Sequence, residues 1–209
     1  VLGTFLLQKL APLKPILYVG ESGTAKTLTI QNYMRSLDPE ANLLLSLNMS
    51  SGTNSRDVQS NLENNVDKRS GAIYGPPAGK KLIVFLDDLN MPFVDTYGTQ
   101  QPITLLQTLM SRGFFYDRGK DLNQKILKDL DYIAAMGPPG GARAVISERL
   151  QSRFNCINCT APADDTMKRI FGIMINQKLM DFDESFKSLG DQLTSSTITL
   201  YLNVVEKFL

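Results

Sequence analysis

Short continuous apolar runs alternate along the chain with longer segments in which apolar residues recur every three or four positions. Continuous runs bounded by turn residues are typical of buried strands, and the helical spacing is typical of helices that bury one face. Their alternation predicts an α/β fold with a parallel sheet between layers of helices. The predicted strands span residues 16–19, 43–47, 82–86, 132–136 and 154–159, and the predicted helices span residues 26–36, 55–66 and 101–111.

Two segments depart from this alternation. Residues 69–81 are rich in turn residues and are expected to form a surface hairpin or loop insertion. Beyond the last predicted strand, residues 164–180 and 197–209 have amphipathic, helical patterns with no strand between them. We therefore expect an α/β core over residues 1–161 and the beginning of a helical subdomain, truncated, over residues 162–209.

A phosphate-binding loop is expected between the first predicted strand and the helix after it. The segment matches the pattern G-x-x-x-x-G-K-[ST] at every position except the second glycine, which is Ala25. In such a loop, Lys26 contacts the β- and γ-phosphates and the hydroxyl of Thr27 binds Mg²⁺, while backbone N–H groups and the helix dipole hold phosphate oxygens. The expected nucleotide-binding residues are Gly20, Glu21, Ser22, Gly23, Thr24, Ala25, Lys26, Thr27 and Leu28.

The alanine in this loop is its one irregular position. Ala25 costs little if its φ is negative, but its methyl group narrows the room for close backbone approach. The alternative to a phosphate loop is an ordinary turn between a strand and a helix.

Two carboxylates follow the most apolar of the predicted strands. Asp87 and Asp88 come directly after residues 82–86, where a ligand crevice is expected at the carboxyl end of a central parallel strand. Asp87 is the expected Mg²⁺ residue, either directly or through water, and Asp88 is expected to polarise the attacking water. The alternative is that both residues merely cap a following helix.

Composition excludes several classes of chemistry. The chain of 209 residues has no histidine, so histidine-based triads and histidine-ligated zinc sites are excluded. Its 22 basic and 21 acidic residues leave a net charge of +1, which provides no electrostatic footprint for nucleic acid. Nothing resembles a signal peptide or a membrane span, so we expect no membrane partner and a reducing, cytosolic setting. The missing initiator Met and the abrupt end favour a piece of a longer chain.

The chain has a single C-x-x-C pattern, formed by Cys156 and Cys159. Both lie in a predicted strand, where residues three apart point to opposite faces. A structural role is therefore favoured over a redox or zinc site, because the two thiols cannot easily clasp one metal ion.

Two arginines precede the last predicted strand. Arg149 lies near the end of a helix-like stretch over residues 144–151, and Arg153 lies just after it. In ring-forming ATPases an arginine in this place stabilises charge on a neighbour's γ-phosphate, and the alternative is a solvated basic helix end. The turn residues 137–143 after the fourth strand are expected to bring backbone close to the nucleotide edge of the sheet.

Together these segments resemble an AAA+ module of a dynein heavy chain, and are most similar to the third AAA+ module of the axonemal, or ciliary, type. The resemblance covers nearly the whole chain. It rests on GESGTAKT at 20–27, SLNMSS at 46–51, VDKR at 66–69, YGPPAGKK at 74–81, DDLNMP at 87–92, GPPGG at 137–141 and NCT at 158–160.

This resemblance implies an AAA+ P-loop NTPase large domain with a five-stranded parallel sheet sandwiched by helices, and a helical lid that begins near residue 163. It implies ATP or ADP with Mg²⁺ as cofactors, and membership of a six-module ring on one polypeptide. Arg149 would then act in trans on the site of the preceding module. Partners would be the neighbouring modules, dynein accessory chains and, only indirectly, the microtubule, in the cytoplasm and cytoskeleton of a cilium or flagellum axoneme.

Two departures from the family's active pattern both affect hydrolysis. The glutamate usual at the end of the acidic strand is Asp88, whose carboxylate is retracted by roughly 1.5 Å. The polar sensor residue usual after the fourth strand is Gly137. Since misplacement by about 1 Å can cost on the order of a hundredfold in rate, nucleotide binding is expected to survive better than turnover. The expected function is regulation of the motor through nucleotide occupancy with slow or conditional hydrolysis; an actively cycling ATPase module and a structural ring spacer are the alternatives.

Overall fold

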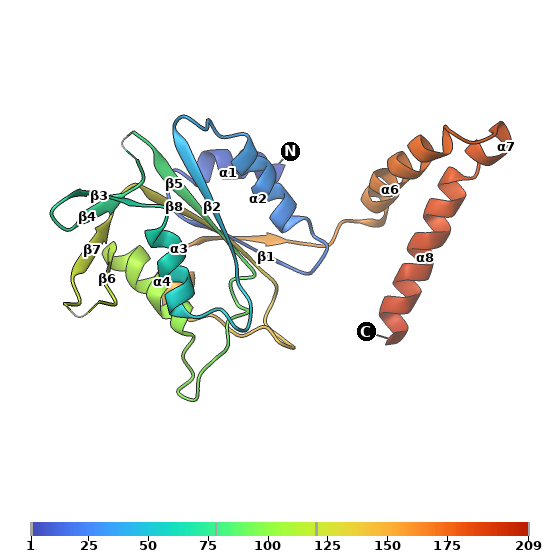
Figure 1. The fold of residues 1–209 in the computed structure, drawn as a ribbon. Helices are drawn as coiled ribbons and strands as arrows, with labels where there is room; N and C mark the ends of the chain where they lie inside the picture. Colours follow the sequence, from blue (N-terminus) through green and yellow to red (C-terminus); the bar gives the residue numbers. More distant parts are fainter. Residues whose placement is uncertain (1, 78, 120, 209) are drawn as a thin grey trace. The chain divides into compact units, whose positions relative to one another are not determined.

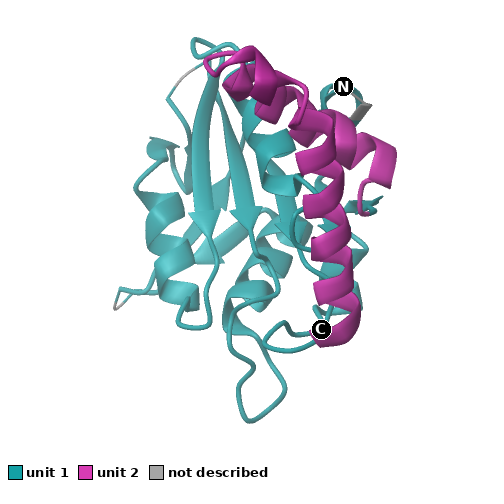
Figure 2. Cartoon of the chain, turned by 90° about the vertical axis from the view of Figure 1, so that its right-hand side faces the viewer, with its two compact units in different colours: residues 1–160 teal, residues 161–209 magenta. Residues whose placement is uncertain are grey.

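The computed structural model describes residues 2–77, 79–119 and 121–208. It contains two compact units, one ending at Thr160 and one beginning at Ala161 (Figure 2). Each unit has its own packing.

The first unit is built on a five-stranded parallel sheet with the strand order β2-β5-β8-β1-β9. Every predicted strand is present, and its observed ends lie within two residues of the expected ones. The observed strands are β1 (Ile16–Gly20), β2 (Asn42–Asn48), β5 (Lys81–Asp87), β8 (Leu130–Met136) and β9 (Asn155–Cys159).

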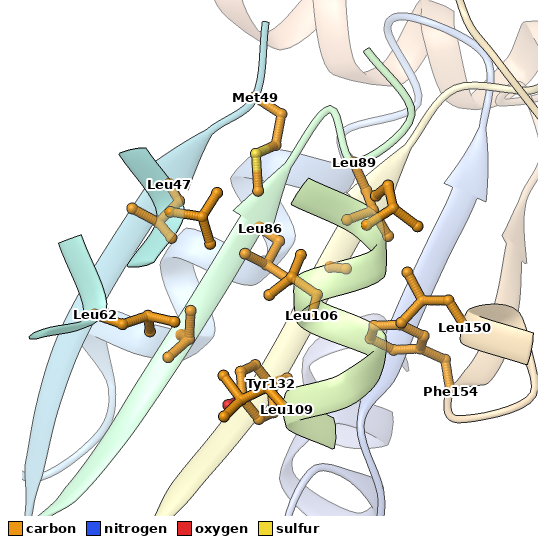
Figure 3. Packing of buried hydrophobic residues seen from close by; sticks show 14 of the residues in the cluster. Leu47, Met49, Leu62, Leu86, Leu89, Leu106, Leu109, Tyr132, Leu150 and Phe154 are labelled. Atoms are coloured by element: carbon orange, nitrogen blue, oxygen red, sulfur yellow. The ribbon is translucent and has the colours of Figure 1, made fainter. Parts of the chain in front are cut away.

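Helices cover both faces of this sheet (Figure 1). On one face, α3 (Ser55–Glu63) and α4 (Gln101–Arg112) bury apolar residues against the strands, including Leu62 and Leu106 (Figure 3). On the other face, α1 (Leu2–Leu10) and α2 (Lys26–Arg35) form a second cluster around Ile30 and Phe85. The predicted α/β architecture of a helix-sandwiched parallel sheet is therefore confirmed. Helix α1 was not expected from the sequence pattern.

A second sheet of four short strands, in the order β3-β4-β7-β6, lies in the same unit. The predicted hairpin is present in β3 (Asp67–Ser70) and β4 (Ile73–Gly75), although Ala78 of the expected insertion lies outside the described residues. The hairpin is not isolated, because β4 pairs with β7 (Gln124–Leu127), which pairs in turn with β6 (Phe114–Tyr116). The sequence pattern did not predict β6 and β7.

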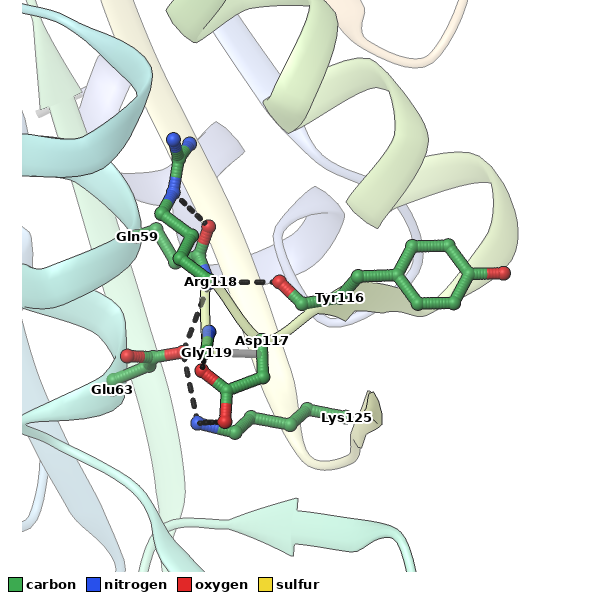
Figure 4. Close-up of polar contacts among 7 residues, drawn as sticks. All are labelled: Gln59, Glu63, Tyr116, Asp117, Arg118, Gly119 and Lys125. Atoms are coloured by element: carbon green, nitrogen blue, oxygen red, sulfur yellow. Dashed lines mark hydrogen bonds and ion pairs between the residues drawn. The ribbon is translucent and has the colours of Figure 1, made fainter. Parts of the chain in front are cut away.

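Polar contacts tie this second sheet to α3 (Figure 4). Gln59, which is 3% exposed, donates to the backbone oxygen of Tyr116 at 3.0 Å and accepts from Nε of Arg118 at 2.8 Å. One turn further along α3, Glu63 pairs with Nζ of Lys125 at 3.1 Å. Buried and half-buried polar groups thus connect α3 to the hairpin that β6 and β7 form.

One predicted helix is much shorter than expected. Residues 144–151 were expected to be helical, but only α5 (Glu148–Gln151) forms. The hydroxyl of Ser147 accepts from the N–H of Leu150 and so caps the helix at that point. Upstream, the N–H of Ala144 donates to the backbone oxygen of Asn90 at 3.0 Å, which holds the chain in a non-helical conformation.

The second unit contains only helices in its described residues: α6 (Asp164–Leu179), α7 (Glu184–Lys187) and α8 (Gly190–Phe208). The helix expected at 197–209 therefore begins seven residues earlier, and Leu209 lies outside the described residues. Close packing of α6 and α8 involves Gly172 and the buried Thr194, whose hydroxyl bonds the backbone oxygen of Gly190. Most of the large apolar residues of this unit remain exposed.

Candidate functional site

The expected site residues meet at one edge of the five-stranded sheet. Because β1, β5 and β8 are parallel, their carboxyl ends lie together. Gly20 and Asp87 end their strands, and Gly137 follows the last residue of β8. The pairing of Val19 with Met136 sets the phosphate-loop strand directly beside the turn that begins at Gly137.

Close packing of backbone explains why the loop begins with a glycine. A Cβ atom on Gly20 would lie 2.2 Å from the backbone oxygen of Cys159 on the neighbouring strand β9. No side chain fits at that separation. The first glycine of the motif therefore serves the pairing of β1 with β9 and fixes the point where the chain leaves the sheet.

The lysine of the loop folds back over the loop backbone. Its Nζ donates to the backbone oxygens of Gly20 and Glu21 at 2.8 and 2.7 Å, and to the hydroxyl of Thr24 at 3.3 Å. Within the described residues, Lys26 has no carboxylate partner. Its charge is therefore held at the loop by neutral oxygen atoms and is available to an anion.

The N-terminus of α2 has no side-chain cap. The N–H groups of residues 22–25 donate to no other atom of the described chain. Helix N-termini carry unpaired N–H groups and a partial positive charge, so the loop presents several donors to an anion. An ordinary strand-to-helix turn would not explain why a lysine and uncapped N–H groups lie together.

Ala25 has a left-handed backbone conformation, with φ of 59° and ψ of 26°. The condition under which this alanine costs little, a negative φ, is therefore not met. Non-glycine residues with positive φ typically cost about 1–3 kcal/mol when their surroundings impose the conformation. The loop keeps the backbone shape that a glycine provides and bears a strain that a glycine avoids.

Thr27 and Asp87 lie in direct contact although they are far apart in the sequence. The hydroxyl of Thr27 donates to Oδ2 of Asp87 at 2.9 Å and lies 3.2 Å from Oδ1. Burial raises the pKa of Asp87 above its usual value, and the bond from Thr27 opposes that shift. A hydroxyl and a half-buried carboxylate brought together in this way are the hard oxygen ligands that Mg²⁺ prefers.

The second aspartate has a different environment. Asp88 is exposed and has a positive φ of 51°. Its N–H donates to Oδ1 of Asp87 at 3.1 Å, and its backbone oxygen accepts from Met91. The alternative in which both aspartates cap the next helix is wrong, because the next helix, α4, begins only at Gln101.

In the sequence, Arg149 and Arg153 are distant from the phosphate loop at residues 20–27. Arg149 is an exposed residue of α5 beside a surface groove that also includes Gln107 and Glu148. Arg153 is exposed and precedes β9, so it lies at the amino edge of the sheet, opposite the edge that carries the loop. Among the described residues, no side-chain hydrogen bond or ion pair joins either arginine to Lys26, Thr27 or Asp87.

Both cysteines are free thiols, with Cys156 exposed and Cys159 half-buried. Burial raises the pKa of each thiol. Throughout the described residues there is no group of three or more acidic or thiol side chains arranged to hold a metal ion. None of the described helices is long and apolar enough to cross a membrane.

Sequence reasoning missed one buried polar residue near this edge. Asn90 is fully buried, and its side-chain amide donates to the backbone oxygen of Gly137 at 2.9 Å. It therefore connects the segment after β5 to the turn after β8. Its position two residues after the paired aspartates was visible in the sequence, but its burial and its partner, 47 residues away, were not.

Comparison with known proteins identifies a related protein family. The family described as "P-loop containing dynein motor region" matches residues 2–162. Human "Dynein axonemal heavy chain 10" is 46% identical over 97% of this chain, and mouse "Dynein axonemal heavy chain 2" is 48% identical over 93% of it. "Dynein-1-alpha heavy chain, flagellar inner arm I1 complex" of Chlamydomonas reinhardtii is 46% identical over 93%.

The chain spans only 4–5% of the length of these three relatives. The matched family region nevertheless includes the whole five-stranded sheet, the phosphate loop and both aspartates. The identity to the relatives extends into the helical second unit as well. The chain belongs to the family of P-loop containing dynein motor regions.

Proposed function

We propose that this chain is an ATP- or ADP-binding AAA+ module that regulates a ciliary microtubule motor through nucleotide occupancy, with slow or conditional hydrolysis. The observation that carries this proposal is the contact between Thr27 and Asp87, with Lys26 held at the same edge of the sheet. These groups would hold the phosphates and Mg²⁺ of a nucleotide, and Mg²⁺ would supply charge neutralisation there.

Weak hydrolysis is inferred from the neighbouring groups. Asp88 is one methylene shorter than the glutamate expected at its position, and its side chain makes no hydrogen bond or ion pair with another described residue. Gly137 has no side chain with which to orient water. A reaction that depends on a positioned base and a positioned donor loses rate when either is displaced or removed.

The setting of the module follows from its relatives. Three of them are named axonemal or flagellar dynein heavy chains, so we infer a cilium or flagellum axoneme and the cytoskeleton as the location. We further propose that the chain is the third module of the ring, with neighbouring AAA+ modules and dynein accessory chains as partners. In that ring Arg149, which is exposed, would serve the site of the preceding module.

Nucleotide binding by the purified 209-residue chain tests the proposal. We expect Lys26→Ala to lower the affinity for Mg-ATP and Mg-ADP by at least about tenfold, because it removes a charged hydrogen-bond donor worth roughly 1.5–3 kcal/mol. Isothermal titration calorimetry measures both affinities. The matched control is Lys68→Ala, which removes an exposed lysine from the second sheet.

Two results would contradict the proposal. A folded chain that binds no Mg-nucleotide would favour a structural ring spacer. Rapid intrinsic turnover that Asp88→Asn removes would instead favour an actively cycling module. Because an isolated module lacks its neighbour's arginine, turnover must also be measured in the complete heavy-chain ring.

A further inference from the structure

The turn after β8 holds an arginine against Gly137. A Cβ atom built on Gly137 would lie 2.6 Å from Nε of Arg143 and 2.8 Å from its Cδ and Cζ. Cδ is the last aliphatic carbon of the arginine side chain, and Nε and Cζ belong to its guanidinium group. The Arg143 side chain therefore occupies the space that a side chain at position 137 would need.

The three atoms nearest to the missing Cβ of Gly137 all belong to the Arg143 side chain. The backbone of Gly137 does not have the positive φ that favours glycine, and no closer atom than those of Arg143 surrounds the missing Cβ. In β8, Ile133 and Ala135 face the apolar cluster to which Ile30 of α2 belongs. By the alternation of side chains along a strand, position 137 faces the same side, on which the phosphate loop passes into α2.

The backbone of the turn that carries Arg143 is held by hydrogen bonds, whereas its guanidinium group has no acidic partner among the described residues. A tight turn joins Gly140 and Arg143 by two backbone hydrogen bonds of 3.0 and 3.1 Å. Asn90 holds both ends of the segment, through its side chain to Gly137 and through its backbone oxygen to Ala144. Within the described residues Arg143 forms no ion pair, and its Nε is buried without a hydrogen-bond partner.

An unpaired, partly buried guanidinium group is costly unless an anion completes it. We propose that Arg143 takes the place of the absent side chain at position 137 and contacts the terminal phosphate of a bound nucleoside triphosphate. Its planar fork suits a phosphate group with several equivalent oxygens. Because Lys26 already serves both kinds of nucleotide, Arg143 would distinguish triphosphate from diphosphate.

This inference rests on the proposed function, because it assumes that the loop binds nucleotide. The first test compares affinities for Mg-ADP and for the non-hydrolysable analogue AMP-PNP with Mg²⁺ by isothermal titration calorimetry. We expect Arg143→Ala to weaken AMP-PNP binding by about tenfold or more and ADP binding by less than about twofold. Arg153→Ala is the matched control, since it removes an exposed arginine at the opposite edge of the sheet.

A side-chain exchange gives a second test that does not depend on one variant folding well. Gly137→Asn alone should displace the Arg143 side chain and weaken AMP-PNP binding. When it is combined with Arg143→Ala, the new asparagine has room, and part of the AMP-PNP affinity should return. Arg143→Lys retains the charge without the fork and should fall between the wild type and Arg143→Ala.

Each outcome is decisive. Equal losses for ADP and AMP-PNP, or unchanged affinities in Arg143→Ala, would overturn the role of Arg143 while leaving nucleotide binding intact. Additive losses in the double variant, without recovery, would contradict the substitution of one side chain by the other. Failure of the unaltered, folded chain to bind either nucleotide would overturn the proposed function, and this inference with it.

Discussion

The residues at the carboxyl ends of the strands form two groups, or halves of the site, that differ in how many contacts their side chains make. On the half that would hold a nucleotide, Lys26 is anchored by three hydrogen bonds and Thr27 is bonded to Asp87. On the half that would activate water, Asp88 is exposed with no side-chain partner among the described residues, and Gly137 has no side chain. From this difference we expect that substitutions can separate nucleotide binding from turnover, because each would depend on different residues.

The largest effect should come from the better-built half. Thr27→Ala removes the hydroxyl that contacts Asp87, so we expect the Mg²⁺-dependent part of ATP affinity to fall by about 10- to 100-fold, the usual cost of losing one partner at a metal site. Calorimetry with and without Mg²⁺ measures it. Thr27→Ser keeps the hydroxyl and should remain close to the wild type. Identical Mg²⁺ dependence in the alanine variant would show that the two halves do not differ as described.

A smaller effect should come from the strained position of the loop. Ala25→Gly relieves the positive φ of 59°, so we expect stability to rise by about 1 kcal/mol and the melting temperature by about 2–4 °C. Ala25→Val, which adds a β-branched side chain at the same φ, should lower both. Thermal unfolding followed by circular dichroism checks these directions. A glycine variant less stable than the wild type would mean that the left-handed conformation carries no strain.

Asp87 should make stability depend weakly on pH. Burial raises the pKa of Asp87, so the folded chain binds this proton more tightly than the unfolded chain and loses stability as pH rises through the folded-state value. Asp87→Asn cannot ionise, so its stability relative to the wild type should increase from acidic to neutral pH. We expect this change in stability to be smaller than the one for Ala25→Gly, because the carboxylate of Asp87 is only half-buried.

Unfolding in urea across this pH range, without Mg²⁺ or nucleotide, measures the difference. Glu40→Gln, at an exposed carboxylate, provides the baseline. A stability difference that grows on acidification would contradict the stated direction for Asp87.

The smallest effect should come from the less complete half. We expect Asp88→Asn to change turnover by less than about twofold, because a carboxylate displaced by about 1 Å already loses most of its effect on the rate. Phosphate release, measured in the complete ring, tests this. Asp88→Glu restores the missing methylene and is the informative companion variant. A large loss in the asparagine variant would make the two halves equivalent and favour an actively cycling module.

The local sequence was sufficient where a feature depends on neighbouring residues. Continuous apolar runs predicted the central strands β1, β5 and β8, since burial on both faces requires apolar residues throughout. Shorter apolar stretches predicted the edge strands β2 and β9, which are only partly buried. The local sequence did not predict β6 and β7, and it predicted a longer helix than α5. These elements are short, and their ends depend on pairing with β4 or on the bond from Ala144 to Asn90.

By itself, the sequence determined the α/β class, the phosphate loop and the paired aspartates at a strand end, because each is written in consecutive residues whose spacing matches a strand, a turn or a helix. Only the tertiary structure decided which residues meet: Thr27 with Asp87 across 60 positions, and Arg143 over Gly137. It also decided that Ala25 has a positive φ. The physical reason is that such contacts and conformations result from strand order, register and packing, which no local pattern specifies.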